Sequence, residues 1–140
     1  MVMYMYQNCL IDTLQLPCAE FGNEKKREVR VIASPQTTGE DHMTFVSCTI
    51  PPGAVSEGHI HDDFDEYIQF QSEGECQIDE ETFLVPAQAV VHARAGHRHE
   101  CRNTSTDQTL YLSCVFLPPL VPYGPYPDLL ERTRTYLSGH

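Results

Sequence analysis

The sequence predicts an all-β fold, a double-stranded β-helix or jelly-roll barrel with a short C-terminal helix. Two observations support this prediction. Short runs of β-branched and aromatic residues recur with turn residues between them, and one helical pattern stands near the end of the chain. The 140 residues can form one domain with its own core, and no internal repeat marks a second one. We therefore expect a single domain over residues 1–140, with a core of about 29–117.

The first part of the chain predicts an arm followed by two strands. Residues 1–28 contain apolar pieces broken by Asn8, Pro17 and Gly22, which favours an edge strand or an arm that packs on the barrel or on a second subunit. Arg30 either points from the next strand into a pocket, where it could bind an acid group, or is simply exposed. In order, we expect a charged turn at 23–28, a strand at 29–33, a loop at 34–42 and a strand at 43–50.

The second part predicts five further strands and a helix. Two prolines end the last strand, and residues 120–127 form a strap rich in proline and tyrosine, with extended character. A helix over 128–137 follows, with Asp128 at its N-cap. Its apolar positions would pack on the outside of the barrel: Leu129, Leu130, Thr133 and Leu137. The strands are expected at 66–71, 76–79, 82–85, 88–92 and 110–117.

Two histidines and a carboxylate in the middle of the chain predict a metal site. His59 and His61 are two residues apart, so on a strand both imidazoles point to the same face and can reach one ion. Glu66 begins the next expected strand and points the same way as Ile68 and Phe70, where a carboxylate is costly unless it is paired or bound to a metal. An isolated H-x-H is most often a pair of surface histidines, but the joint pattern favours a divalent first-row metal.

Residues 97–102 repeat this arrangement. On an extended segment His97, His99 and Cys101 share one face, and the charged residues Arg98, Glu100 and Arg102 share the other. This pattern indicates solvent outside and a pocket inside, and it makes His99 the fourth candidate metal ligand. Cys101 is either a small buried hydrophobe, which we favour, or a soft thiolate ligand that would favour zinc or copper. The candidate pocket residues are Ile68, Phe70, His97 and Cys101.

The spacing of these residues resembles the cupin family. The first cupin motif runs G-x5-H-x-H, three or four residues, E, six residues and G, and the chain matches it at Gly53, His59, His61 and Glu66, with Gly74 one residue late. The second motif runs G-x5-P-x-G-x-x-H-x3-N, and the chain matches it at Gly96, His99 and Asn103, with Gln88 and Arg94 in place of the first glycine and the proline. The resemblance implies a jelly-roll barrel, commonly a homodimer, with a metal ion held by His59, His61, Glu66 and His99.

Three imidazoles and one carboxylate leave two positions open on a six-coordinate ion. Nitrogen and oxygen ligands suit iron, manganese, nickel, cobalt or zinc. An ion with open positions can hold a substrate by two oxygens and act as a Lewis acid, lower the pKa of bound water or activate dioxygen. We therefore expect a metalloenzyme that acts on a small oxygen-rich molecule as a dioxygenase, isomerase, cyclase or lyase. A non-catalytic binding or sensor barrel is the alternative, and a structural or storage role is the weakest interpretation.

Charge and cysteine content argue against several partners. A net charge of −11 disfavours nucleic acid, whose binding depends on phosphate neutralisation, and disfavours an anionic membrane surface. The six cysteines are spread out without C-x-x-C spacing, and no run approaches transmembrane length. The first residues lack the basic start and apolar core of a secretory signal, so we expect a cytoplasmic protein with free thiols. No phosphate loop or dinucleotide fingerprint occurs, which argues against ATP and nicotinamide dependence.

Overall fold

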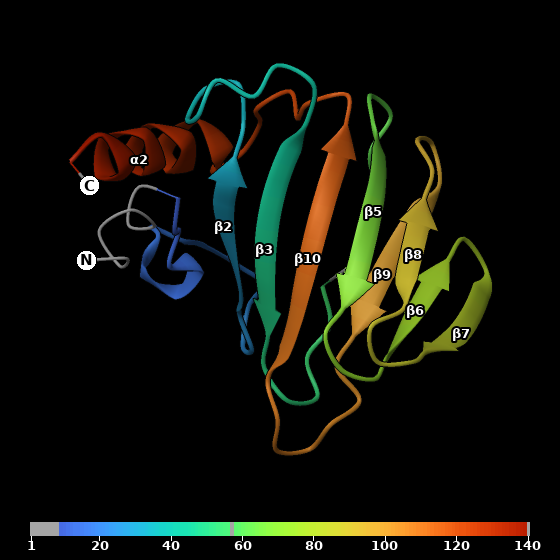
Figure 1. Ribbon diagram of the computed structural model, residues 1–140. Helices are drawn as coiled ribbons and strands as arrows, with labels where there is room; N and C mark the ends of the chain where they lie inside the picture. The colour runs from blue at the N-terminus through green and yellow to red at the C-terminus, as the bar shows by residue number, and fades with distance from the viewer. Residues whose placement is uncertain (1–8, 57, 140) are drawn as a thin grey trace.

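The computed structural model describes residues 9–56 and 58–139, and within them the chain forms two antiparallel sheets and a C-terminal helix (Figure 1). The larger sheet holds, in spatial order, β1 (Ala19–Phe21), β2 (Arg27–Ala33), β3 (Thr44–Ile50), β10 (Leu110–Leu117), β5 (Asp65–Phe70) and β8 (Val90–Ala93). The smaller sheet holds β4 (His59–Ile60), β9 (Arg98–Arg102), β6 (Gly74–Ile78) and β7 (Glu81–Val85). The predicted all-β class with a short C-terminal helix is confirmed.

Strand β10 lies inside the larger sheet because both of its edges are paired. Cys114, for example, is opposite Val46 of β3 on one side and Ile68 of β5 on the other. Its side chains alternate, so that one face of the strand is buried: Leu110, Leu112, Cys114 and Phe116. These side chains belong to one core cluster with residues of the smaller sheet, including Cys76 and Cys101. The period-two alternation of this segment is therefore what brings it into the core.

The N-terminal segment covers the outer face of β2. Residues Thr13–Gln15 form a 3-10 turn, and β1 pairs antiparallel with β2. Arg30 lies beneath this segment, where its Nε donates a hydrogen bond to the Leu16 carbonyl at 3.3 Å and its Nη1 pairs with Glu28 at 3.3 Å. Arg30 is therefore buried in a structural position. Both expectations for it, a side chain in a pocket or an exposed one, are wrong. The first eight residues of the predicted arm lie outside the described residues.

A tight hairpin joins β6 to β7 at the acidic turn that the sequence predicts. Asp79 adopts a positive φ of 52°, and its carboxylate binds His97 Nδ1 at 2.6 Å and the Arg98 backbone N–H at 3.1 Å. Strand β6 begins at Gly74, two residues before the expected start. A Cβ at Gly74 would lie 2.8 Å from the ring of Phe70 on β5, so the close packing of this ring against β6 requires glycine there.

Helix α2 (Tyr126–Ser138) lies beside β2 at one side of the larger sheet (Figure 1). It begins two residues earlier than predicted, with Pro125 at the N-cap, because Pro127 is well tolerated in the first helical turn. The prediction that Asp128 caps the helix is wrong, since Asp128 lies in the first turn and pairs with Arg132 at 2.8 Å. Its buried residues are Tyr126, Leu129, Leu130 and Thr133. Among the described residues, no helix is both long and apolar enough to span a membrane.

Candidate metal centre

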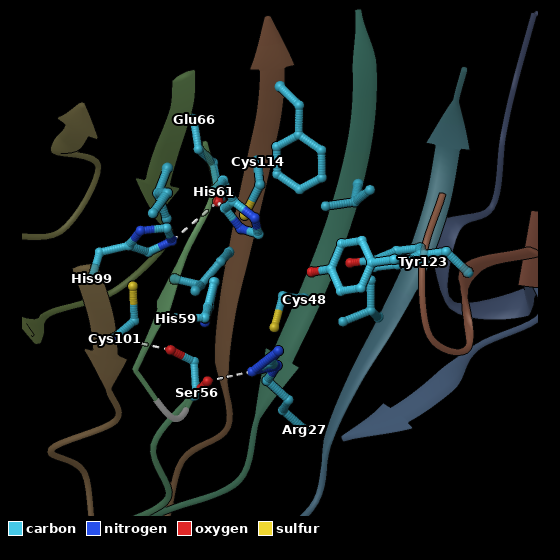
Figure 2. A pocket seen from close by; sticks show the side chains of 16 residues that line it. Arg27, Cys48, Ser56, His59, His61, Glu66, His99, Cys101, Cys114 and Tyr123 are labelled. Atoms are coloured by element: carbon cyan, nitrogen blue, oxygen red, sulfur yellow. Dashed lines mark hydrogen bonds and ion pairs between the residues drawn. The ribbon is translucent and has the colours of Figure 1, made fainter. Parts of the chain in front are cut away.

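Four side chains from both sheets converge at one end of the core. His59 lies on β4, His61 directly follows it, Glu66 lies on β5, and His99 lies on β9. Each offers one donor atom, and the four donor atoms all lie within 4.8 Å of one another (Figure 2). The structure thus brings together the four residues that the sequence analysis selected as metal ligands.

The pairing of β4 with β9 sets the positions of two of these histidines. His59 and His99 are directly opposite each other in the register, and their ring centroids lie 4.3 Å apart. Along β9 the side chains of His99 and Cys101 are buried, while those of the neighbouring arginines are exposed. Because side chains on a strand alternate between faces, this register presents both imidazoles to the interior.

Glu66 points into the interior from β5 and is 6% exposed. Its Oε1 lies 3.5 Å from His61 Nε2 and 3.2 Å from His99 Nε2. Burial on its own would raise the pKa of this carboxyl, but the two imidazoles outweigh burial and lower the pKa to about 2. The cluster therefore contains one ionised carboxylate at neutral pH.

These contacts do not satisfy the buried polar atoms. Glu66 Oε1 and both ring nitrogens of His99 have no hydrogen-bond partner within the described residues, although their surfaces are buried. An unpartnered buried carboxylate or imidazole is costly, by about 1–3 kcal/mol for a neutral group and more for a charged one. Donor atoms that bind one ion at about 2.1 Å lie about 3 Å apart when they are at right angles around it. The distances and the unpartnered atoms both fit a bound cation.

A stack of aromatic rings orients His61. The His61 ring stacks on Phe64 with a centroid distance of 4.4 Å, and Phe64 stacks in turn on Phe116 at 4.6 Å. Both phenylalanines are buried, so the imidazole has little freedom to turn away from Glu66. The aromatic residues flanking the motif therefore hold one candidate ligand in place.

The cluster forms part of the wall of a small cavity of about 40 Å³. Of the four predicted pocket residues, Ile68 and Cys101 line this cavity. Phe70 is fully buried but lies in the core against Gly74, outside the cavity lining. His97 does not line this cavity, and the expectation that it shares the inward face of His99 is wrong: it precedes β9, its side chain is half exposed, and Asp79 binds it on the outer surface.

Several cavity residues were not identified from the sequence. Arg27 lines the cavity because it begins β2 and shares a face with Val29. The same alternation that turns Val29 inward also predicts an inward Arg27, provided that the strand begins at residue 27 and not at residue 29. Tyr123 comes from the strap, where no local pattern predicts which way a side chain points. The thiols of Cys48 and Cys114 complete this part of the wall.

Both of these thiols are protonated at neutral pH. Burial raises the pKa of Cys48 to about 12. Burial, and then the nearby Glu66 carboxylate, raises the pKa of Cys114 well above its usual value. Neither thiol is poised to act as a thiolate, since only the deprotonated form is a strong nucleophile or metal ligand.

Neither a family model nor a curated protein sequence matches the chain. A predicted oxalate decarboxylase from Thermotoga maritima superposes with a TM-score of 0.68 at 18% identity, over 78% of this chain and 98% of that one. A variant of Bacillus subtilis oxalate decarboxylase gives 0.66 at 18%, over 80% of this chain and 30% of that one. The cupin domain of Schizosaccharomyces pombe Cnp3 gives 0.60 at 11%, over 75% and 70%.

The chain has the cupin fold. The two departures of its second motif occur at turns, and one of them keeps the backbone shape of the residue it replaces. Gln88 stands where the cupin motif has a glycine, and it adopts a positive φ of 71°. Its side-chain amide donates to the Gln71 carbonyl at 3.0 Å, which helps to hold this conformation. Asn103, which matches the motif, is buried and donates to the carbonyls of Ile50 and Gln108. Asn103 thus joins the end of β3 to the turn before β10 and fixes this part of the cupin scaffold.

Proposed function

We propose that the chain binds one divalent first-row transition metal ion and uses it to transform a small oxygen-rich organic molecule. The ligands would be His59, His61, Glu66 and His99, and the metal iron, manganese, zinc or nickel. The observation that carries this proposal is the convergence of four donor side chains whose buried atoms include several without a hydrogen-bond partner in the described part of the chain.

The reaction class stays within dioxygenase, isomerase, cyclase and lyase chemistry. When bound, the ion would supply Lewis-acid polarisation of substrate oxygens, a bound water of lowered pKa, or a site for dioxygen. The oxalate decarboxylases among the similar structures support the lyase member of this set, although at 18% identity the likeness concerns the fold. One fold supports many reactions, so the surrounding side chains must decide among them.

The chain's own residues would bind, orient and shield the substrate. Phe64 and Phe116 keep His61 in position, and the apolar residues of the wall exclude water: Val29, Val46, Ile68 and Leu112. Tyr123 and Tyr126 lie on another side of the cavity with ring centroids 5.3 Å apart. A cavity this small admits only a compact ligand, or part of a larger one.

Turnover by the metal-loaded protein tests this proposal. Native protein reconstituted with each of the four metals is offered small hydroxy acids, keto acids and sugar derivatives, with oxygen uptake and product NMR as readouts. His61→Ala and Glu66→Gln should abolish every metal-dependent reaction that the native protein performs. A reaction that continues undiminished in both variants would show that the cluster is not catalytic.

A non-catalytic binding barrel is the second candidate. Apart from the four candidate ligands, the cavity lining contains one charged side chain, Arg27, and its other side chains are neutral. Such a lining can hold a ligand but offers few groups for acid–base catalysis. A binder should retain a metabolite through purification and release it chemically unchanged on denaturation. Mass spectrometry of the released material distinguishes this function from catalysis.

We further propose that the protein works in a reducing compartment such as the cytoplasm. All six cysteines are free, including Cys76 and Cys101, which face each other directly across β6 and β9. Disulfides are rare in reducing compartments, which agrees with this state.

The homodimer implied by the family resemblance stays a prediction, which sizing chromatography can check. The lack of a nucleic-acid partner also stays a prediction, and a DNA-binding assay can check it.

A further inference from the structure

Arg27 is the arginine that lines the cavity, and no carboxylate in the described residues pairs with it. Five of the seven arginines pair with a carboxylate in the described part of the chain: Arg30, Arg98, Arg102, Arg132 and Arg134. Arg27 and Arg94 form no such pair there, although the chain carries 20 acidic residues and only nine basic ones, and Arg94 does not line the cavity. The side chain of Arg27 is partly buried and lines the cavity that holds the metal cluster.

The position of Arg27 is built by two neighbouring elements. Its guanidinium lies over the Phe21 ring, 4.7 Å from the centroid, and its Nη1 donates to the Ser56 carbonyl. Ser56 is fixed in turn, because its backbone N–H donates to the Cys101 carbonyl and its hydroxyl accepts from the Cys101 N–H, both at 2.8 Å. The aromatic face and the fixed carbonyl hold the guanidinium in one place.

One hydrogen bond leaves most of the guanidinium available. An arginine has five N–H donors in a planar fork, and in the described residues Arg27 uses one of them, toward Ser56. In Figure 2, Arg27 and Ser56 lie at one end of the cavity and Glu66 at the other, with Cys48 between them. A ligand in the cavity could thus contact the metal cluster and Arg27 at the same time.

The charge of the lining favours an anionic ligand. Glu66 is the one acidic residue of the lining, and thiols and phenols are ordinarily neutral at pH 7. Arg27 and Glu66 therefore balance each other, and a divalent cation on the cluster would give the cavity a net positive charge. Positive charge in a partly buried cavity is costly unless a bound anion compensates it.

We propose that Arg27 binds a carboxylate of the substrate, so that the ligand of this cavity is a small carboxylic acid. This inference rests on the proposed function, which it narrows to one substrate class. The planar fork of arginine matches the two oxygens of a carboxylate. A phosphate would need further donors to its remaining oxygens, and the cavity presents a single cationic side chain.

The test compares charged and neutral ligands on the full-length, metal-loaded protein. Glycolate, malonate, the neutral amide of each acid and inorganic phosphate are titrated calorimetrically into native protein, Arg27→Gln, Arg27→Lys and the control Arg134→Gln. The control removes one positive charge on α2, where Arg134 is exposed and pairs with Glu131. Metal content and melting temperature are measured for every variant, so that loss of folding is recognised.

We expect native protein to bind at least one acid about tenfold or more tightly than its amide. Arg27→Gln should weaken acid binding by about tenfold to a hundredfold with its metal content unchanged, because a hydrogen-bonded ion pair is lost. Arg27→Lys should be intermediate, since it keeps the charge without the fork, and Arg134→Gln should bind like the native protein.

Three results would overturn the inference. The first is that folded Arg27→Gln binds the acids as tightly as the native protein does. The second is that the native protein binds acid and amide equally. The third is that it binds inorganic phosphate more tightly than either acid. If no metal binds to any variant, the proposed function fails separately. The same titrations on metal-free protein then decide whether acid binding depends on Arg27.

Discussion

The backbone N–H of Gly96 donates a hydrogen bond of 2.8 Å to the carbonyl of His61. This bond joins the turn before β9 to the segment after β4, and so links the two stretches of chain that carry the histidines. Gly96 has a φ of +84°, which residues with a Cβ rarely adopt. The position of His61 therefore depends on a turn that only glycine forms without strain.

Gly96→Ala should lower the free energy of unfolding by about 1 kcal/mol and weaken metal binding. No atom lies within 4 Å of the added Cβ, so the cost comes from the backbone alone. Urea unfolding and a metal titration measure the two effects. Gly139→Ala is the control, because its φ is −90° and an added Cβ meets only ordinary contacts. Equal losses in both variants would contradict this account.

His99→Ala should remove bound metal from the purified protein, while His97→Ala should retain it. Both changes delete an imidazole from the same short segment, but His99 belongs to the buried cluster and His97 lies on the surface against Asp79. Elemental analysis of native protein and both variants, after identical purification and reconstitution, measures the difference. Full metal content in His99→Ala, or equal loss in both variants, would count against the four-ligand site.

Added metal should raise the melting temperature of the native protein more than that of Glu66→Gln. A ligand that binds only the folded state stabilises it by about 2.7 kcal/mol when its free concentration is 100 times its Kd. The glutamine keeps the shape of Glu66 but removes the negative charge from the cluster. Thermal unfolding with and without Zn²⁺ or Mn²⁺ measures this shift. A metal-induced shift of the same size in Glu66→Gln would show that the carboxylate does not bind the ion.

Asp79→Asn should destabilise the protein near neutral pH and have little effect in acid. The hydrogen bond with His97, followed by that from the Arg98 N–H, lowers the pKa of Asp79 in the folded state. The stabilisation is therefore present above the unfolded pKa, about 3.9, and is lost as the pH falls through the lower folded value. Asparagine also tolerates the positive φ at this turn, so the change tests the charge.

Urea midpoints of native protein and Asp79→Asn, measured from pH 7 down to pH 3, follow this dependence. The two midpoints should converge as the pH falls. A gap that stays constant over the whole range would mean that the carboxylate charge is not responsible for it.

Alkylation at pH 8 should modify Cys9 first and Cys18 more slowly. Cys9 is exposed, whereas burial and the neighbouring Glu28 raise the pKa of the half-buried Cys18. The other four cysteines are buried and should react only after unfolding: Cys48, Cys76, Cys101 and Cys114. Mass spectrometry after treatment with iodoacetamide, in buffer and in urea, identifies the modified positions. Modification of the cavity thiols at the rate of Cys9 would contradict the structure.

The orientation of strand residues could be predicted because alternation is a local property of the chain. Spacing alone predicts that Glu66 and Ile68 point inward from one strand and His99 and Cys101 from another, and all four are buried in the structure. The same rule failed at His97 because alternation holds only inside a strand. The chain before Arg98 turns to meet Asp79, which is distant in sequence and which no local pattern connects to it.

The rest of the cavity depends on how distant elements pack. The alternation of β2 turns Arg27 into the cavity and Arg30 to the opposite face. There the segment that contains Leu16 covers Arg30, and no local pattern in the sequence predicts this cover. Tyr123 reaches the cavity from the strap because α2 packs beside β2, which is a tertiary arrangement. The four residues of the candidate metal cluster could thus be selected from motifs, whereas the rest of the cavity lining required the three-dimensional structure.

The place of β10 inside the larger sheet bears on the order in which the protein assembles during synthesis. Its two neighbours, β3 and β5, are both made earlier in the chain. A nascent chain that has emerged only as far as β9 therefore holds two half-sheets with unpaired edges, which are prone to join other chains. Pairing between segments so far apart also slows folding. Because β10 contributes Cys114 and Phe116 to the cavity, the site cannot be complete until this late strand has been inserted.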